Sequence, residues 1–349
     1  MKLLKILIVI ITFFTLLLVI YLQLPHSTPK LLYIPSINEP YFEEALKLQK
    51  IPLKPFELKL LDKYKKVESK WIRLNKDRVS KIELIKAILN NPPQKTRIMI
   101  MYGGSWIKDF IKTISKQANL DFNQTLATYY NLAAFKEGGI IAGKYKIPYN
   151  TTPNATIAYM VYKSNSFFKE MAKRYQVEFD SKEFREKVII ASIIQKETSS
   201  YDDMPFIASV IYNRLKKGIK LQLDATLNYG KNSHTIITPT MIRNDTSKFN
   251  TYKFKGLPPS PIGSFSKSAL FASFAPAKSE YLYFVKRGKT HIFSSTYQEH
   301  KKHVKAYKER VYKNRAKKIA KILKEPIKIE LNLSLRFKPD LLIYKLKLK

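Results

Sequence analysis

The residue with the clearest chemical potential in this sequence is an acid inside an apolar run. Residues 187–197 have the spacing of a helix, and the face that carries Glu197 also carries three isoleucines, Ile190, Ile193 and Ile194. Burial on that face makes ionisation of the carboxyl group costly and raises its pKa. A carboxylic acid that keeps its proton near neutral pH can act as a general acid. The alternative is that the helix frays after Ile194 and leaves Glu197 in solvent.

The residues after this helix predict elements that form a cleft beside it. A second helix is expected to begin at Asp202 or Asp203 and to end before Gly218. Residues 219–224 then alternate between apolar and polar side chains, which predicts a strand. The polar face of that strand contains Lys220, Gln222 and Asp224. A buried acid followed closely by a polar strand face indicates a binding cleft.

The same region carries a collinear series of longer motifs. They are residues 191–198 (ASIIQKET), 208–215 (ASVIYNRL), 221–226 (LQLDAT), 250–252 (NTY), 256–262 (GLPPSPI), 276–278 (PAK), 281–285 (YLYFV) and 291–293 (HIF). The series resembles the endolytic murein transglycosylase family, also called YceG-like, from about residue 188 to 310. The resemblance implies a lyase that cleaves the β-1,4 bond between N-acetylmuramic acid and N-acetylglucosamine inside peptidoglycan strands, and that terminates growing strands.

The resemblance also assigns the acid. The family's catalytic group is the second acidic residue of a Glu-Lys-Glu-Thr motif, which is Glu197 here, whereas the first acidic position is Gln195. Glu197 is expected to protonate the departing glycosidic oxygen and then to accept the proton of the muramic 6-hydroxyl as that oxygen attacks C1. The product carries a 1,6-anhydro ring. Hydrolysis with Asp224 as a second carboxylate is the alternative chemistry, and an inactive wall-binding adaptor is the alternative class.

Six polar residues near this acid are predicted to bind substrate. They are Asn213, Arg214, Gln222, Asp224, Thr251 and Tyr252. Gln222 and Asp224 are expected to orient the sugar or to support Glu197, and Tyr252 to stack on a sugar face. Arg214 has two interpretations, contact with a substrate carboxylate or an ion pair with Asp224.

The N-terminus predicts a membrane anchor. The run from Ile6 to Leu22 is apolar and follows Lys2 and Lys5, and no cleavage pattern appears before Pro25. The basic N-terminus is expected to stay in the cytoplasm, which places the body outside the inner (plasma) membrane, in the periplasm where there is one. A cleaved signal peptide is the alternative. The expected partners are glycan strands, this membrane and, by resemblance, peptidoglycan synthases.

Composition argues against several other classes of protein. The net charge of +36 is spread along the chain without a nucleic-acid-binding motif, so no nucleic acid partner is expected. Attraction to an anionic membrane or wall polymer explains the sign of the charge equally well. The chain has no cysteine and five scattered histidines, and His291 is expected to be a packed or hydrogen-bonded residue. We therefore expect no metal and no cofactor.

The region before the catalytic motifs predicts a small α+β module. Ser80 and Glu83 have the spacing of a capping box, residues 97–102 predict a strand, and residues 105–111 begin another helix. In the resembled family this region is a LysM-like glycan-binding module. Trp71, Tyr102 and Trp106 are candidates for sugar stacking, although core packing is the expected role of each. A long helix over residues 157–175 is expected to lead into the catalytic core.

The predicted fold class is α+β: an N-terminal transmembrane helix, a LysM-like module, and a mixed α/β catalytic domain whose active-site helix lies next to a sheet. The expected boundaries are 1–5 for a cytoplasmic tip, 6–24 for the transmembrane helix, 29–130 for the module, 131–320 for the catalytic domain and 321–349 for a basic extension. Residues 327–338 of that extension alternate strictly and predict a strand with one apolar face.

Overall fold

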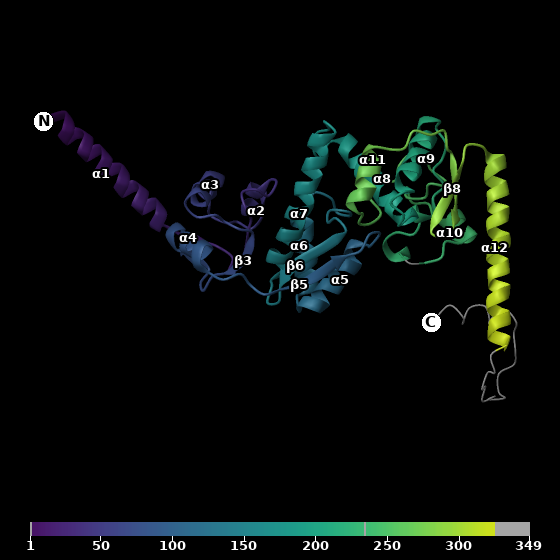
Figure 1. The fold of residues 1–349 in the computed structure, drawn as a ribbon, viewed down its shortest axis with the longest axis horizontal. Helices are drawn as coiled ribbons and strands as arrows, with labels where there is room; N and C mark the ends of the chain where they lie inside the picture. Colours follow the sequence, from purple (N-terminus) through teal and green to yellow (C-terminus); the bar gives the residue numbers. More distant parts are fainter. Residues whose placement is uncertain (1, 234, 325–349) are drawn as a thin grey trace.

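The computed structural model describes residues 2–233 and 235–324. The chain forms an elongated molecule of mixed helices and strands, with helix α1 (Lys2–Gln23) projecting at one end and helix α12 (Tyr297–Lys324) at the other (Figure 1). No residue of α1 is buried. By length and composition, α1 is the one helix in the described residues that could cross a membrane. The predicted apolar segment is therefore an exposed helix.

The first compact unit contains two antiparallel strand pairs, β1 with β4 and β2 with β3, and three short helices. Its elements are β1 (Pro25–Ser27), β2 (Leu31–Ile34), α2 (Phe42–Leu48), α3 (Pro55–Tyr64), β3 (Lys70–Arg73), β4 (Arg78–Ser80) and α4 (Lys81–Asn90). The side chains of Leu32, Leu58, Ile72 and Leu84 are completely buried in its core. The predicted capping box is confirmed, because Ser80 and Glu83 bond reciprocally to each other's backbone N–H groups at the start of α4.

A second unit surrounds the antiparallel pair of β5 (Thr96–Met101) and β6 (Gly143–Pro148), in which Thr96 lies opposite Pro148. Helices α5 (Ile107–Ala118), α6 (Phe122–Leu132) and the first half of α7 (Pro153–Arg174) pack with it. The predicted strand at 97–102 and the predicted long helix thus exist with slightly shifted ends. Trp71 is buried here and donates its indole N–H to the carbonyl of Lys146, so its role is core packing.

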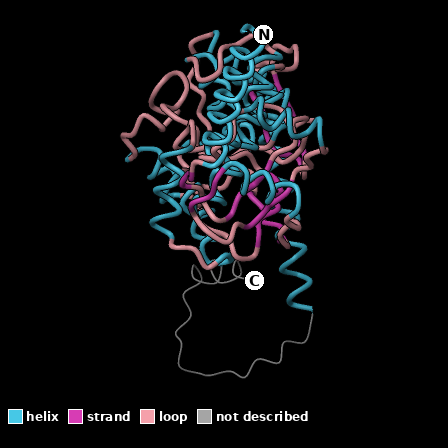
Figure 2. The backbone as a smooth tube through the Cα atoms, turned by 90° about the vertical axis from the view of Figure 1, so that its left-hand side faces the viewer, coloured by secondary structure: helices cyan, strands magenta, loops and turns pink. Residues whose placement is uncertain are grey.

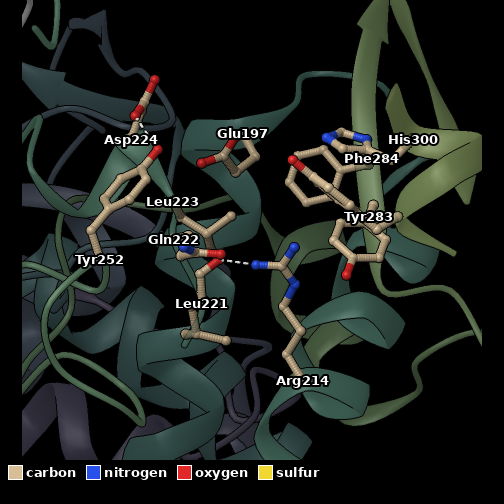
Figure 3. A pocket seen from close by; sticks show the side chains of 11 residues that line it. Glu197, Arg214, Leu221, Gln222, Leu223, Asp224, Tyr252, Tyr283, Phe284 and His300 are labelled. Carbon is tan, nitrogen blue, oxygen red and sulfur yellow. Dashed lines mark hydrogen bonds between the residues drawn. The ribbon is translucent and has the colours of Figure 1, made fainter. Parts of the chain in front are cut away.

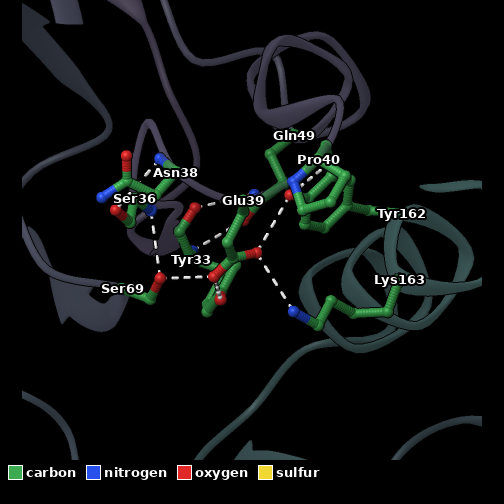
Figure 4. Close-up of polar contacts among 9 residues, drawn as sticks. All are labelled: Tyr33, Ser36, Asn38, Glu39, Pro40, Gln49, Ser69, Tyr162 and Lys163. Atoms are coloured by element: carbon green, nitrogen blue, oxygen red, sulfur yellow. Dashed lines mark hydrogen bonds and ion pairs between the residues drawn. The ribbon is translucent and has the colours of Figure 1, made fainter. Parts of the chain in front are cut away.

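Two carboxylates of the first unit bond to α7: Glu44 contacts Asn165 and Lys169, and Glu39 makes the contacts drawn in Figure 4. Glu39 accepts hydrogen bonds from the hydroxyls of Tyr33 and Ser69, and from Tyr162 at 2.9 Å, and it pairs with Lys163 at 3.1 Å. Burial opposes ionisation of Glu39, but these hydrogen bonds outweigh it and lower its pKa. The ionised carboxylate of Glu39 therefore stabilises the contact between the two units.

The third unit contains the predicted acid. Its elements are α8 (Lys182–Glu197), α9 (Met204–Lys216), η1 (Asp224–Thr226), η2 (Gly230–Asn232), α10 (Pro239–Asn244), α11 (Lys267–Phe274), β7 (Tyr283–Arg287), β8 (Thr290–Ser294) and α12. Helix α8 packs mainly against α11 and α9, and the β7–β8 hairpin packs against α9 and α12. The second half of α7 joins the same hydrophobic core through Phe168 and Met171.

The sheets are smaller than the sequence suggests. The strands in the described part of the chain occur as four separate two-stranded pairs among a majority of helices (Figure 2). The α+β class is correct, but α8 is supported chiefly by helices. The extended pattern at 327–338 lies outside the described residues.

The predicted strand at 219–224 is wrong. This segment is irregular and leads into the short helix η1. Leu221 and Leu223 are buried, as the alternation requires, but the backbone amides of Gln222 and Leu223 bond to Thr251 instead of to a neighbouring strand. Gln222 also adopts a left-handed conformation, with φ of 52°. The two leucines are therefore buried in alternation although the segment forms no sheet.

Candidate active site

Glu197 is the last residue of α8, and the isoleucine face predicted from the sequence holds it in place. Ile190, Ile193 and Ile194 are at most 1% exposed, whereas Glu197 is half-buried. Ser181 caps the start of this helix by accepting from the backbone N–H of Phe184, and at its end the backbone N–H of Thr198 donates to the carbonyl of Ile194. The helix does not fray before Glu197, and the acid lies at its end beside open space.

The environment of Glu197 favours the protonated carboxyl group. Burial is the main cause that raises its pKa to about 7, and the nearby charge of Asp224 adds to it, while a hydrogen bond from the backbone of Ala225 acts in the opposite direction. Its Oε1 has no hydrogen-bond partner among the described residues. One buried oxygen therefore lacks a hydrogen-bond partner, on a carboxyl group whose pKa suits proton transfer near neutral pH.

Two cavities meet at Glu197 and Asp224, which line both. The first, which we call the aromatic pocket, has a volume of about 330 Å³ and includes Arg214, Gln222, Tyr252, Tyr283, Phe284 and His300 (Figure 3). The second, which we call the glycine pocket, has a volume of about 460 Å³ and includes Gly103, Gly104, Gln195, Lys196 and Asn228. The acid thus lies where a chain-like ligand could continue on both sides.

Four of the six predicted binding residues line the aromatic pocket, namely Arg214, Gln222, Asp224 and Tyr252. Gln222 and Asp224 are exposed, and Tyr252 donates its hydroxyl hydrogen to Asp224 Oδ1 at 2.7 Å. The left-handed backbone at Gln222 and the turn of η1 bring Gln222 and Asp224 to the same cavity although no strand connects them. Figure 3 shows Tyr252 and Asp224 on one side of Glu197.

The two remaining predicted residues, Asn213 and Thr251, are occupied by backbone contacts. Asn213 Nδ2 donates to the carbonyls of Ser279 and Tyr281 at 2.8 and 3.0 Å. Thr251 is 1% exposed, and its hydroxyl oxygen accepts from the backbone N–H of Leu223 at 3.1 Å. Both side chains therefore support backbone segments next to the cleft.

Arg214 also holds backbone groups, but it borders the aromatic pocket as well. Its Nε donates to the carbonyl of Leu282 and its Nη1 to the carbonyls of Leu221 and Lys220. It forms no ion pair with Asp224, which excludes one of its two sequence-based interpretations. The other interpretation, a substrate carboxylate, stays a prediction.

Gln195, where the resembled family has an acid, connects α8 to two other segments. Its Oε1 accepts from the backbone N–H of Ser266 at the start of α11, and its side chain lies against Gly103 in the loop after β5. The same loop is bonded to Ser264, because Gly104 N–H donates to its carbonyl at 2.8 Å. These contacts form the floor of the glycine pocket.

Sequence reasoning missed several residues of the site. Tyr283, Tyr297 and His300 line the aromatic pocket, and they come from β7 and from the first turns of α12. Lys196 lines the glycine pocket and donates to the carbonyl of Asn228. The motif 281–285 indicated the position of Tyr283. Nothing in the sequence indicated that the first turns of α12 would line the pocket that contains Glu197.

The remaining predictions concern His291 and metal ions. His291 Nδ1 lies 2.9 Å from Asp203 Oδ2, so the expectation of a hydrogen-bonded histidine is confirmed. Asp203 occupies the N-cap position of α9, but its carboxylate binds His291 instead of capping the helix. Within residues 2–233 and 235–324, no group of three or more His, Cys, Asp or Glu side chains has a metal-binding arrangement.

Comparison with known proteins identifies relatives of this chain. The sequence profile of the YceG-like family matches residues 48–306. A protein named endolytic murein transglycosylase from Bacillus subtilis (strain 168) is 33% identical over 178 residues, which cover 49% of this chain and 48% of that protein. One of the same name from Streptococcus pneumoniae (strain R6) is 32% identical over 155 residues, covering 43% and 28%.

These curated relatives are matched over about half of their length or less. A crystal structure of a YceG-like protein from Listeria monocytogenes shares the fold, with a TM-score of 0.51 and 22% identity over 78% of this chain and 97% of that one. The family match covers both pockets and most of the second and third units. The chain therefore belongs to the YceG-like family.

Proposed function

We propose that this protein is an endolytic lytic transglycosylase that cleaves peptidoglycan strands between N-acetylmuramic acid and N-acetylglucosamine. The observation that carries the proposal is the position of Glu197, a half-buried acid at the junction of two cavities. An enzyme that cuts inside a polymer must hold chain on both sides of the broken bond. The names of the Bacillus and Streptococcus relatives support the same substrate class.

The proposed reaction uses one side chain twice. Glu197, protonated at neutral pH, donates its proton to the glycosidic oxygen as the bond to C1 breaks. The resulting carboxylate then accepts the proton of the 6-hydroxyl of the muramic sugar while that oxygen bonds to C1. The products are a 1,6-anhydro end and a free 4-hydroxyl end, and Glu197 has regained its proton. The raised pKa and the free Oε1 of Glu197 support both steps.

The neighbouring side chains would bind and orient the sugar. We assign direct sugar contacts to Gln222, Asp224 and Tyr252, whose side chains border the aromatic pocket. Asn213 and Thr251 would act through the backbone segments that they hold. Asp224, already bonded to Tyr252, would keep a negative charge beside the positive charge that develops at C1.

The rest of the chain would bring this site to the wall. Helix α1 would be a single-pass anchor in the inner (plasma) membrane, with residues 1–5 in the cytoplasm and the body outside it. Residues 29–130 would form a LysM-like glycan-binding module and residues 131–320 the catalytic domain. A role beside peptidoglycan synthases, in terminating nascent strands, follows from this placement. The full exposure and apolar composition of α1 support the anchor.

The test is product analysis with the full chain in detergent. The protein is incubated with purified peptidoglycan, and released fragments are identified by mass spectrometry. We expect anhydro-muropeptides from the native chain and a loss of at least about a hundredfold in Glu197→Gln, because general acid catalysis contributes roughly 10² to 10⁴ in rate. Glu183→Gln, on the exposed first turn of α8, is the matched control and should retain activity.

Other products would contradict the proposal in different ways. Fragments with reducing muramic ends, lost in both Glu197→Gln and Asp224→Asn, would indicate a two-carboxylate hydrolase. No release by a folded native chain would favour a wall-binding adaptor. A fully active Glu197→Gln chain would eliminate the mechanism.

A further inference from the structure

The aromatic pocket contains a buried cation with no counter-ion. Arg214, in the last turn of α9, is 8% exposed, and all three of its hydrogen bonds go to backbone carbonyls. None of the ion pairs in the described part of the chain includes it. Guanidinium keeps its charge in proteins, so a full positive charge is held away from water and faces only neutral acceptors.

The guanidinium has a donor left for a ligand. Its contacts use Nε and Nη1, and Figure 3 shows the remaining nitrogen, Nη2, directed into the space between Glu197 and Tyr283. Tyr283 lies against the guanidinium, with 5.0 Å between Cζ and the ring centroid, and His300 stacks on Tyr283 with centroids 5.1 Å apart. These planar groups fix the orientation of the fork, so the free donor is preorganised.

The glycine pocket differs in this respect. Its cation, Lys196, bonds to the carbonyl of Asn228 and also lies near the carboxyl groups of Glu137 and Asp109. Burial is the main cause that lowers the pKa of Lys196, and these two acids act against it. Arg214 has no acid in a comparable position. Of the two cations, Arg214 is therefore the one with no acid among the groups that act on it.

We propose that Arg214 makes the aromatic pocket the subsite for the carboxylate-bearing sugar of the substrate. This inference rests on the proposed function and adds a direction to it. The carboxylate is either the lactyl acid of the muramic sugar or, where that acid is amidated, an acidic group of its peptide. A charge-assisted bond from Nη2 would stabilise either one. The acid-bearing sugar then lies on the arginine side of Glu197 and the unsubstituted sugar in the glycine pocket, which selects one of the two alternating bonds.

The pocket size is consistent with one substituted ring. A volume of about 330 Å³ is near the lower end of the range of small-ligand sites, roughly 300 to 1,000 Å³. The aromatic walls formed by Phe284 and Tyr283 match the apolar face of a sugar ring, and Arg214 adds the polar contact that fixes its orientation.

The test compares small probes on the native full chain in detergent. Affinities of N-acetylmuramic acid, its methyl ester and N-acetylglucosamine are measured by ligand-observed NMR titration. We expect the free acid to bind about tenfold more tightly than the other two, because they lack the charge. Equal affinities would overturn the proposal. Muramyl dipeptide separates the two sources of carboxylate: affinity like that of the free acid assigns the peptide's acid, and affinity like that of the ester assigns the lactyl acid.

Variants locate the effect in the aromatic pocket. Arg214→Gln should abolish the preference, but it also breaks bonds to three carbonyls, so its folding is checked by thermal unfolding. Gln222→Glu leaves those bonds intact and places a negative charge on an exposed side chain that lines the same pocket. It should reduce the preference to less than about twofold, because the added negative charge repels a carboxylate in that pocket. Lys196→Gln, in the glycine pocket, should leave the preference for the free acid unchanged. If Lys196→Gln were the only variant to lose this preference, the assignment to Arg214 would be contradicted.

These outcomes are independent of catalysis, since none of the probes contains the bond to be cut. A chain that releases no anhydro-muropeptides can still prefer the free acid, and an active chain can lack the preference.

Discussion

At the scale of single residues, the proposed chemistry depends on where Glu197 lies between the protein interior and solvent. The isoleucine face supplies the low-polarity side, and the two pockets supply access. Asp224 lies near enough for its charge to raise the pKa of Glu197 but is itself exposed and bonded to Tyr252. The two carboxyl groups therefore have different environments, which is how paired acids acquire different roles.

The pH dependence of strand cleavage should report the protonation of Glu197. The acid must be protonated to act, so the rate should be constant at low pH and fall about tenfold per unit as pH rises above about 7. Asp224→Asn removes the charge that raises the pKa of Glu197, so the falling limb should move to lower pH. Rates are measured from anhydro-muropeptide release in buffers of constant ionic strength. A limb that stays in place in Asp224→Asn would separate Asp224 from the titration.

At the scale of elements, the helices that carry the site were predictable and the segment between them was not. Apolar spacing and caps located α8 and α9 to within a few residues. The alternation at 219–224 correctly identified the buried leucines, but a sequence pattern does not show which partner takes the backbone hydrogen bonds. Here the partners are Arg214 and Thr251, one from a neighbouring helix and one from a later loop.

The floor of the glycine pocket can be tested through Gly103. A Cβ at this position would lie 2.6 Å from Cδ of Gln195, whose Oε1 is held by Ser266. We expect Gly103→Ala to lower the free energy of unfolding by about 1–2 kcal/mol in urea titrations, because overpacking of a held side chain is costly. Gly143→Ala, at the start of β6 with no atom within 4 Å of the added Cβ, should change it by less than about 0.5 kcal/mol.

The double variant Gly103→Ala/Gln195→Ala gives the decisive comparison. If Gln195 is the side chain that Gly103 accommodates, its removal should cancel most of the cost of Gly103→Ala. Additive losses would mean that the glycine is required for another reason.

At the scale of the whole molecule, the described residues form three hydrophobic clusters, and α7 contributes to two of them. The order of these regions, the apolar N-terminal helix and the family of the catalytic part were predictable from sequence. The contacts between regions were not, because they depend on side chains far apart in sequence. Glu39 and Tyr162 are an example: neither belongs to a recognisable motif, yet they join the first unit to α7.

Removal of Glu39 should loosen the first unit from the rest. Glu39→Ala leaves the buried hydroxyl of Tyr162 without its carboxylate partner, which we expect to cost about 2–4 kcal/mol. Calorimetry should then show an additional transition at lower temperature. Lys163→Ala is the matched control: this lysine is 39% exposed, and such pairs contribute about 0–1 kcal/mol. A single unshifted transition in Glu39→Ala would show that other contacts, among them those of Glu44 with Asn165 and Lys169, join the units without Glu39.

The end of α1 has a mechanical consequence. Tyr21 donates its hydroxyl hydrogen to Glu57 at 2.9 Å, and Lys81, only 5% exposed, bonds to both and lies over the tyrosine ring. These contacts fix the orientation of α1 relative to the body, whereas a flexible linker would let the body move freely. With α1 inserted as proposed, rotation of the protein about α1 would keep the cleft at one distance from the membrane surface. Strands would then be cut at a set distance from the membrane, whichever enzyme extrudes them.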